Sequence, residues 1–424
     1  MNKSFFFMFL LIPIAIFSQN VNGRISSSVY SFERFDENKE PETFFRAYES
    51  LILNINQDNF SIRTRVNYET NLSNSLVNDP KLRFYNLYFE GRDLLGLATV
   101  KVGRQSLFNS VAGGTYDGAS LKLKYTDYQA SVFYGGNVPA YQKLELNKDW
   151  KNNYVLGGKV SAEPIEDLYV ALTYIDKNYK SEDYTVTRLD ENYNPIDVLI
   201  KSKSNQFKFA TAEVDYTFDK SLSFYTRVDY DINFETLSKY ELNGNYKATD
   251  NLGINVYYNF REPRIRYNSI FTVFNYGNTQ EIEAGLNYTV NKDFSLSGKF
   301  GNVEYKDDNS QRATVGLNTK FGNVSYRKTF GYAGELDAIS LYSAKSFMDG
   351  FLTPSAGISF TSYKLSPDED TNTLTSVLAG VNVRPLRTLS FDVQGQYFNN
   401  KIYENDLRLL IKLNYWFNTN LNLL

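Results

Sequence analysis

The sequence has no cysteine and no histidine among its 424 residues, and prolines are few, numbering 10. Without cysteine, the chain can form no disulfide and cannot be anchored by a lipid attached to a cysteine. Histidine titrates nearest to neutral pH and is the usual base that activates a serine or a water molecule. Zinc and copper sites also rely mostly on histidine and cysteine. We therefore expect no enzyme activity, no metal site and no cofactor.

Long apolar runs are also absent, apart from residues 5–17 near the start of the chain. This run follows the basic Lys3 and ends at the small Ser18, which is the arrangement of a secretory signal peptide. We predict a signal peptide over residues 1–18 and a single domain over residues 19–424. No later stretch approaches the roughly 18 apolar residues of a transmembrane helix. The formal net charge of −3 is too small to indicate nucleic acid as a partner.

What the sequence does contain is an alternation of apolar and polar side chains. The last such stretch, residues 406–417, has Leu, Leu, Ile, Leu, Tyr and Phe at odd positions and mostly charged or polar side chains at even positions. A strand turns alternate side chains to opposite faces, so each stretch has one apolar and one polar face. The mean hydropathy of −0.41 fits a barrel in which only alternate residues face lipid. The last strand ends at Phe417 or continues through Leu421 and Leu423.

Short and long connectors follow each other along the chain, which is typical of outer-membrane barrels with short periplasmic turns. The longer connectors are residues 71–80, 107–116, 138–152, 180–205, 262–279 and 365–372. About 22 strands (range 18–22) begin near residues 24, 42, 59, 81, 98, 118, 129, 153, 168, 206, 222, 237, 252, 280, 294, 312, 323, 336, 353, 373, 389 and 406. We predict an all-β fold, a transmembrane antiparallel up-and-down β-barrel. We expect no plug domain, because the first strand begins next to the signal peptide.

Carboxylate pairs are the strongest remaining candidates for catalysis. Glu213 with Asp215, and Asp229 with Asp231, lie two residues apart on one strand face, and paired carboxylates can perform acid–base chemistry. The other interpretation, which we favour, is that they are solvated charges of a water-filled interior. Two acidic runs of the connectors supply oxygen ligands for calcium but lack the regular spacing of a calcium loop, namely residues 307–308 and 368–370.

The polar faces of the predicted strands supply candidate pore-lining residues. These are Arg63, Arg65, Arg92, Lys101, Arg104, Glu213, Asp215, Arg227, Asp229, Asp231, Arg408 and Lys412. Most basic members fall on strands three to five and on the closing strand, whereas the acidic members fall on strands ten and eleven. This separation predicts a transverse field that would orient dipolar solutes in a channel. The alternative, which we favour, is that each charge pairs with its neighbours and keeps the interior hydrated.

Two charged residues break the alternation. Arg104 shares the parity of Val102 and is therefore expected to face lipid, unless Gly103 forms a bulge that redirects it or the residue lies beyond the membrane edge. Glu49 likewise falls on the apolar face of its strand. Residues 107–116, which contain glycine and are only mildly polar, are the best candidate for a loop that folds inward.

Several segments resemble known families. The sequence Val102-Gly103-Arg104-Gln105, followed by Asp117-Gly118, resembles a segment of large porin-like barrels that include alginate-export-type channels. The closing strand resembles the C-terminal signal that the barrel-assembly machinery of Gram-negative bacteria reads, although seven residues follow Phe417. The whole mature chain resembles Gram-negative porins, because the sequence shares their signal peptide, their alternation of apolar and polar residues, their pattern of turns and their closing strand.

The resemblance implies a passive, water-filled channel for small hydrophilic solutes in the outer membrane, reached through the periplasm. Its implied partners are outer-membrane lipid, the barrel-assembly machinery and small polar solutes. Whether the chain forms a homo-oligomer is left open by the resemblance. One alternative is a barrel that serves as a scaffold or accessory subunit of a surface or secretion complex. Another is a secreted soluble β protein that binds glycans.

Overall fold

The computed structural model describes residues 19–35, 40–73, 79–107, 111–138, 144–179, 184–189, 191, 193–200, 206–265, 277–305, 308–331, 335–364, 366, 368–401 and 405–421. The predicted signal peptide, residues 1–18, lies outside the described residues. The chain forms two compact units. Unit 1 comprises Met1–Gly103, Gly316–Lys328 and Gly334–Leu424, and unit 2 comprises Arg104–Val315 and Thr329–Ala333.

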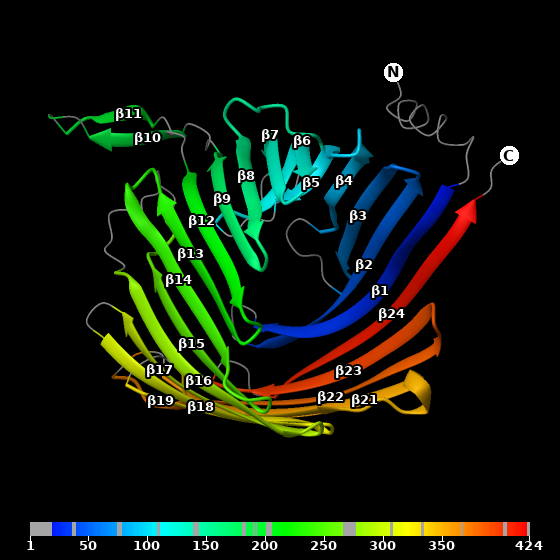
Figure 1. Cartoon of the computed structure of the whole chain (residues 1–424), viewed down its shortest axis with the longest axis vertical. Coiled ribbons are helices and arrows are strands. Elements are labelled where there is room, and N and C mark those ends of the chain that lie inside the picture. The colour runs from blue at the N-terminus through cyan, green and yellow to red at the C-terminus, as the bar shows by residue number, and fades with distance from the viewer. Residues whose placement is uncertain are drawn as a thin grey trace. The chain divides into compact units, whose positions relative to one another are not determined.

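Unit 1 is an antiparallel sheet in which the first and last strands of the chain are neighbours (Figure 1). In spatial order its strands are β19 (Gly322–Phe330), β20 (Glu335–Ala344), β21 (Leu352–Tyr363), β22 (Asn372–Leu386), β23 (Leu389–Asn399), β24 (Asp406–Leu421), β1 (Gln19–Phe35), β2 (Pro41–Gln57), β3 (Phe60–Asn71) and β4 (Lys81–Leu94). Strand β24 pairs with β1 from Leu421 opposite Gln19 to Leu410 opposite Tyr30. The last strand therefore continues past Phe417 to Leu421.

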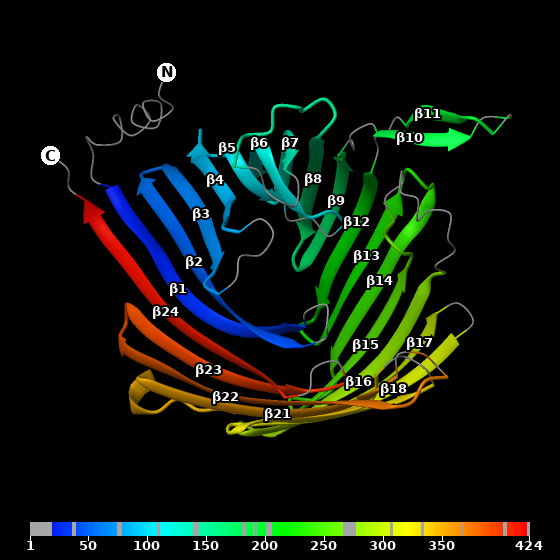
Figure 2. The same cartoon turned by 180° about the vertical axis from the view of Figure 1, so that it is seen from behind.

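Unit 2 consists of a further run of antiparallel strands, seen from behind in Figure 2. In spatial order its strands are β6 (Gly114–Tyr125), β7 (Tyr128–Val138), β8 (Tyr154–Ile165), β9 (Leu168–Lys177), β12 (Phe207–Phe218), β13 (Leu222–Asp231), β14 (Thr236–Lys247), β15 (Leu252–Arg261), β16 (Thr279–Asn291) and β17 (Phe294–Tyr305). Strands β5 (Ala98–Leu107), β18 (Asp308–Thr319) and β19 each contain a boundary between the units.

All of these strands belong to one 22-stranded antiparallel sheet in which β1 also pairs with β24. This is the topology of a closed up-and-down β-barrel, and it confirms the predicted fold class and strand number. A separate hairpin of β10 (Tyr184–Leu189) and β11 (Pro195–Ile200) was not predicted. Its strands are too short, and the connector that contains them too polar, to give a clear alternation. Among the described residues, no helix is long and apolar enough to cross a membrane.

The alternation of faces follows the sequence pattern. On β24, Leu407, Leu409 and Ile411 are exposed on one face, whereas Asp406 and Asn414 are buried on the other. The exposed apolar face is the one that a barrel turns to lipid. Glu49 lies on this apolar face as expected, directly opposite Ser27, whose hydroxyl donates a hydrogen bond to its carboxylate.

The connectors also follow the prediction. Short turns at one edge of the sheet include residues 58–59, 126–127, 166–167 and 387–388, and all of the predicted long connectors lie at the other edge. Both ends of the barrel sheet, at the start of β1 and the end of β24, lie at the short-turn edge. We refer to these edges as the turn edge and the loop edge. At the turn edge, the connector of β20 and β21 carries a single turn of 3-10 helix, η3 (Met348–Gly350).

Candidate functional site

The polar face of unit 2 carries acidic and basic side chains in adjoining positions. Strand register places Glu213 of β12 opposite Arg227 of β13, and Arg227 opposite Glu241 of β14. One step toward the loop edge, Asp229 of β13 lies opposite Lys239 of β14. Side chains directly opposite each other on neighbouring strands lie within contact distance. The sheet therefore alternates the sign of charge across neighbouring strands.

Asp229 is the most enclosed charge on this face, with 0% of its surface exposed. The Arg227 guanidinium donates to both of its carboxylate oxygens, at 2.9 Å from Nε and 2.6 Å from Nη2. Nη2 of Arg264, which follows β15, donates to Oδ2 at 3.1 Å. The Thr211 hydroxyl on β12 donates to Oδ1 at 2.8 Å. Two guanidinium groups and a hydroxyl thus hold one buried carboxylate.

Several other acidic side chains of this face also have basic partners. Glu213 accepts from Lys159 of β8 at 2.7 Å and from the Tyr225 hydroxyl. The remaining ion pairs join Lys239 to Glu241, Arg312 to Glu281 and Glu283, and Lys299 to Glu283. Glu213 and Asp229 of the predicted acidic wall are therefore neutralised locally, which is the alternative that the sequence left open. Asp215 and Asp231, the other two members, form no ion pair with another described residue.

One part of the polar face of unit 1 instead carries a local excess of positive charge. The Glu90 carboxylate on β4 is shared by Arg63 Nε at 3.0 Å, Lys101 Nζ at 3.4 Å and Arg92 Nε at 3.8 Å. The Ser61 hydroxyl also donates to it at 3.1 Å. Glu90 is buried, whereas each of the three basic side chains is about one-third exposed. One carboxylate thus faces three cations, and we call this group the Glu90 cluster.

Sequence reasoning found the three cations of the Glu90 cluster but missed Glu90 itself. Strict alternation along β4 gives both Glu90 and Arg92 the parity of Leu82 and Phe84, which belong to the apolar face, and the prediction placed only Arg92 on the polar face. A bulge at Tyr85 shifts the register, because Asn86 lies opposite Arg65 whereas Phe84 lies opposite Val66. The bulge inserts one residue and so moves Glu90 to the polar face. The sequence signal that could have revealed Glu90 is a two-residue alternation whose phase changes within β4.

A short segment packs on the polar face of unit 2 near the loop edge. Val111 and Ala112 are buried against Val155, Ile175 and Phe209, which come from β8, β9 and β12. These three side chains share the face of Glu213, since Ile175 lies opposite Phe209 and Ala171 opposite Glu213 in the same register. Leu107 and Tyr116 complete the cluster, and Lys177 Nζ donates to the Gly113 carbonyl at 2.5 Å. The described part of residues 107–116 therefore folds onto the polar face, as predicted.

Arg104 lies on the opposite face. Only 3% of its side chain is exposed, and it pairs with Asp117, which is equally buried, at 2.7 Å. Asp117 lies opposite Gly136, on the same face as the exposed Tyr134. Gly103 has a φ of +128°, but Arg104 keeps the parity of the exposed Val102. Its inclusion among the pore-lining candidates is therefore corrected: the guanidinium is buried in an ion pair on the apolar face.

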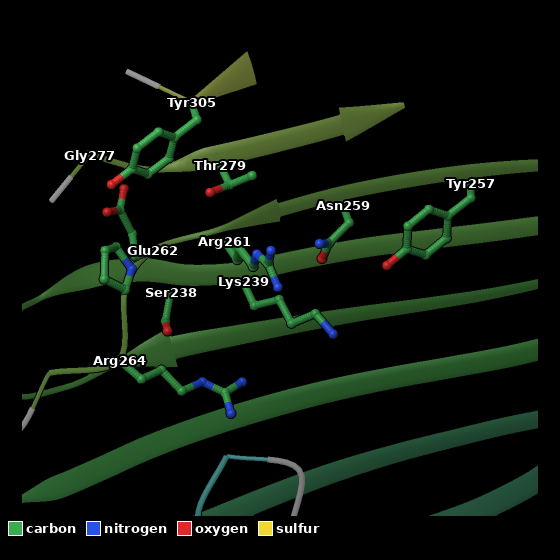
Figure 3. Close-up of a pocket in the computed structure, with 11 residues that line it drawn as sticks. Ser238, Lys239, Tyr257, Asn259, Arg261, Glu262, Arg264, Gly277, Thr279 and Tyr305 are labelled. Carbon is green, nitrogen blue, oxygen red and sulfur yellow. The ribbon is translucent and has the colours of Figure 1, made fainter. Parts of the chain in front are cut away.

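A pocket of about 640 Å³ opens on the polar face of unit 2 (Figure 3). Its basic lining residues are Lys239, Arg261 and Arg264, and Tyr257, Thr279 and Tyr305 add hydroxyl groups. Asn259 also lines it, and its buried Oδ1 has no hydrogen-bond partner among the described residues. The pocket thus presents hydroxyl groups and basic side chains, together with the Glu262 carboxylate, to a bound polar molecule.

The other predicted residues also lie on polar faces. Arg65 stacks over the Tyr85 ring at 5.3 Å. Arg408 pairs with the buried Asp406, and Lys412 lies opposite Asp392. Asp231 accepts the backbone N–H groups of Asn233 and Phe234, and Asp215 is exposed. Within the described ranges, no group of three or more acidic side chains is placed to hold a metal ion, and residue 307 of the predicted calcium candidates lies outside those ranges.

No protein-family model matches the sequence, and no curated protein matches it. Solved structures do match the fold over nearly their whole length. Acinetobacter baumannii OccAB4 is 12% identical, with 95% of this chain and 99% of that chain covered and a TM-score of 0.45. Pseudomonas aeruginosa OccK9 (OpdG) is 10% identical, with 95% and 98% covered and a TM-score of 0.45. The P pilus usher (PapC) translocation pore is 9% identical, with 94% and 99% covered and a TM-score of 0.47.

Proposed function

We propose that this chain is an outer-membrane porin, a passive water-filled channel for small hydrophilic solutes. The observation that carries the proposal is the division of the 22-stranded sheet into an exposed apolar face and a polar face lined with ion pairs. A barrel with this division meets lipid outside and holds water inside. Under the proposal, the long connectors of the loop edge lie outside the cell and the short turns lie in the periplasm.

The polar faces suit polar solutes that cross by diffusion. Rings and patches of charge set the selectivity of a pore, and both kinds of charge are present here. The Glu90 cluster offers partly exposed cations, and the pocket beside Asn259 offers hydroxyl groups and an amide. Outer-membrane lipid and the barrel-assembly machinery are the partners that this proposal requires. The solutes it would pass are small and hydrophilic.

The direct test is the conductance of the purified protein in planar bilayers. We expect discrete, long-lived conductance steps that rise with the salt concentration of the bath, because ions cross through water. A heat-denatured sample of the same preparation serves as the control for detergent artefacts. A correctly folded barrel that inserts but gives no steps would contradict the proposal.

The Glu90 cluster should bias the channel toward anions. Glu90→Gln removes the shared carboxylate and should raise the anion-to-cation permeability ratio, whereas Lys101→Gln should lower it. A unit charge about 4 Å away in water is worth about 1 kcal/mol, which corresponds to a change of up to about fivefold. The measurement is the reversal potential in a salt gradient.

Lys247→Gln provides a matched control for the loss of a positive charge. Lys247 ends β14 at the turn edge and pairs with Asp250 in the adjoining turn. The permeability ratio should change much less in this variant than in Lys101→Gln. Equal shifts in the two variants would show that net charge, and not the Glu90 cluster, sets the selectivity.

The second candidate function is a scaffold or accessory subunit of a surface complex. The hairpin of β10 and β11 favours it, because Leu189, Tyr193, Ile196 and Leu199 are exposed there. Exposed apolar side chains on a small hairpin suit protein binding. In Figure 1 the hairpin extends from the loop edge of unit 2. A barrel that stays silent in bilayers but loses a bound protein when the hairpin is deleted would favour this function.

A further inference from the structure

Residues 144–153, which precede β8, pack on the apolar face of unit 2, and we call them the clasp. The Glu145 carbonyl accepts from Arg104 Nη2 at 2.9 Å, and the Asn147 backbone N–H donates to Asp117 Oδ2 at 2.8 Å. The clasp therefore uses its backbone to cover both ends of the buried Arg104–Asp117 ion pair. Burying a charged pair is tolerated when such additional hydrogen bonds satisfy it.

Trp150 fixes the clasp against the sheet. Its ring lies edge-on to Tyr134, with centroids 5.5 Å apart, and its Nε1 donates to the Asn147 carbonyl at 2.6 Å. A Cβ added at Gly136 would lie 2.8 Å from Trp150 Cδ1 and 2.9 Å from Asn147 Cβ. Glycine at this position is what lets the clasp approach β7 closely. The clasp thus sits on the same face as Tyr134.

Three apolar side chains of the clasp are exposed beside the exposed apolar side chains of that face. Leu144 and Leu146 are 55% and 65% exposed, and Trp150 is 37% exposed. Beside them on β7 and β8, Tyr134 and Leu156 are also exposed. Tryptophan and tyrosine side chains favour the boundary between lipid chains and headgroups. Leucine contributes by burying apolar area in the membrane.

The charges of the clasp balance one another. Lys148 and Lys151 are exposed, and so are Glu145 and Asp149. Asp149 accepts from the side chains of Asn152 and Asn153, which ties it to the clasp itself. A segment with two charges of each sign has little net attraction to an anionic surface. Its affinity for a membrane must therefore come from its apolar and aromatic side chains.

We propose that the clasp is a lipid-binding element that inserts Leu144, Leu146 and Trp150 into the loop-side leaflet of the membrane. In that position it also shields the Arg104–Asp117 pair from the lipid chains. The inference rests on the proposed function, because it requires the apolar face to lie in a membrane. Its ligand is the lipid of that leaflet, contacted through acyl chains and the headgroup boundary.

Tryptophan fluorescence can test this directly, because the chain has two tryptophans. Trp416 lies under the Arg384 guanidinium on the polar face, so Trp416→Phe leaves Trp150 as the reporter and Trp150→Phe leaves Trp416. In phosphatidylcholine vesicles brominated in the upper part of the acyl chains, we expect strong loss of Trp150 emission and little loss for Trp416. Equal quenching of the two tryptophans would overturn the proposal.

A second variant tests whether the close contact at Gly136 of β7, which we call the seat, holds the clasp in place. In the Trp416→Phe background, Gly136→Val should displace Trp150, lowering its quenching by brominated lipid and raising its quenching by aqueous iodide. Gly298→Val is the matched control, because Gly298 on the apolar side of β17 has no neighbour within 4 Å of an added Cβ. If Gly136→Val leaves both measurements unchanged, the proposed seat is wrong.

The same vesicles separate this inference from the channel proposal. Conductance with unquenched Trp150 would refute the clasp inference and leave the channel proposal intact. Quenched Trp150 without conductance would refute the channel proposal and leave the clasp inference intact. Quenching should be the same with and without anionic phosphatidylglycerol, since the clasp charges balance. A requirement for anionic lipid would contradict the apolar mode of binding.

Discussion

Asp229→Ala is expected to destabilise the barrel by about 3–5 kcal/mol, because it leaves the buried Arg227 and the neighbouring Arg264 without their shared carboxylate. Asp229 is fully buried, so water cannot replace the lost partner at that position without a rearrangement of the sheet. The Thr211 hydroxyl also loses its acceptor. The free energy of unfolding in urea, measured for the protein refolded into lipid vesicles, reports the loss.

Asp215→Ala is the matched control for this change. Asp215 lies on β12 on the same polar face, but it is exposed and forms no ion pair with another described residue. Surface substitutions of this kind change stability by no more than about 0.5 kcal/mol. Equal destabilisation by the two variants would show that the total charge of the face matters and that the enclosure of Asp229 does not.

The barrel was predictable from the sequence because its signal is periodic and repeated. In each barrel strand, one face must suit lipid and the other water, so alternation recurs from β1 to β24 and a few errors do not hide it. The alternation of short turns and long loops was an independent signal for an up-and-down barrel. Strand starts such as Lys81, Ala98 and Leu389 are at the predicted positions. The hairpin of β10 and β11 belongs to no such pattern and was missed.

The partners of individual charges were not predictable in the same way. They depend on register between strands, and a single bulge reverses the face of every residue beyond it. The bulge at Tyr85 moves Glu90 to the polar face, where the sequence had predicted only the basic members of the Glu90 cluster. Arg104 shows the opposite case. Its parity was read correctly, but its partner Asp117 and the cover from residues 144–153 come from other strands and a connector.

Basic side chains at neighbouring positions explain why Glu213 and Asp229 do not act as an unpaired acidic group in unit 2. Adding charges strand by strand counts Glu213, Asp229 and Asp231 as an acidic group, but the neighbouring strands β8 and β14 contribute Lys159 and Lys239 at the same heights. A polar face in water gains little from like charges set side by side, since they repel. Alternating signs reduce that repulsion and keep the face hydrated. Selectivity then depends on local excess charge, such as the Glu90 cluster.

Val111→Asp is expected to release residues 111–113 from the polar face and to raise the single-channel conductance. Val111 is buried against Val155, Ile175 and Phe209, and burying a large apolar side chain stabilises such packing by about 1.5–3 kcal/mol. A carboxylate at this position would lose its water with no basic partner in the cluster, so the docked state becomes unfavourable. In a pore lined by this face, an undocked segment leaves more water in the conducting path.

Single-channel recording in planar bilayers measures the effect, and Ser131→Asp is the control. Ser131 lies opposite Lys159 on the polar face of β7 and outside the apolar cluster, so this variant adds the same charge without touching the segment. Its conductance should stay near that of the wild type. If both variants raise the conductance equally, added negative charge attracts cations and the segment does not narrow the pore. If Val111→Asp leaves the conductance unchanged, the segment lies outside the conducting path, because its apolar seat cannot accommodate an ionised carboxylate.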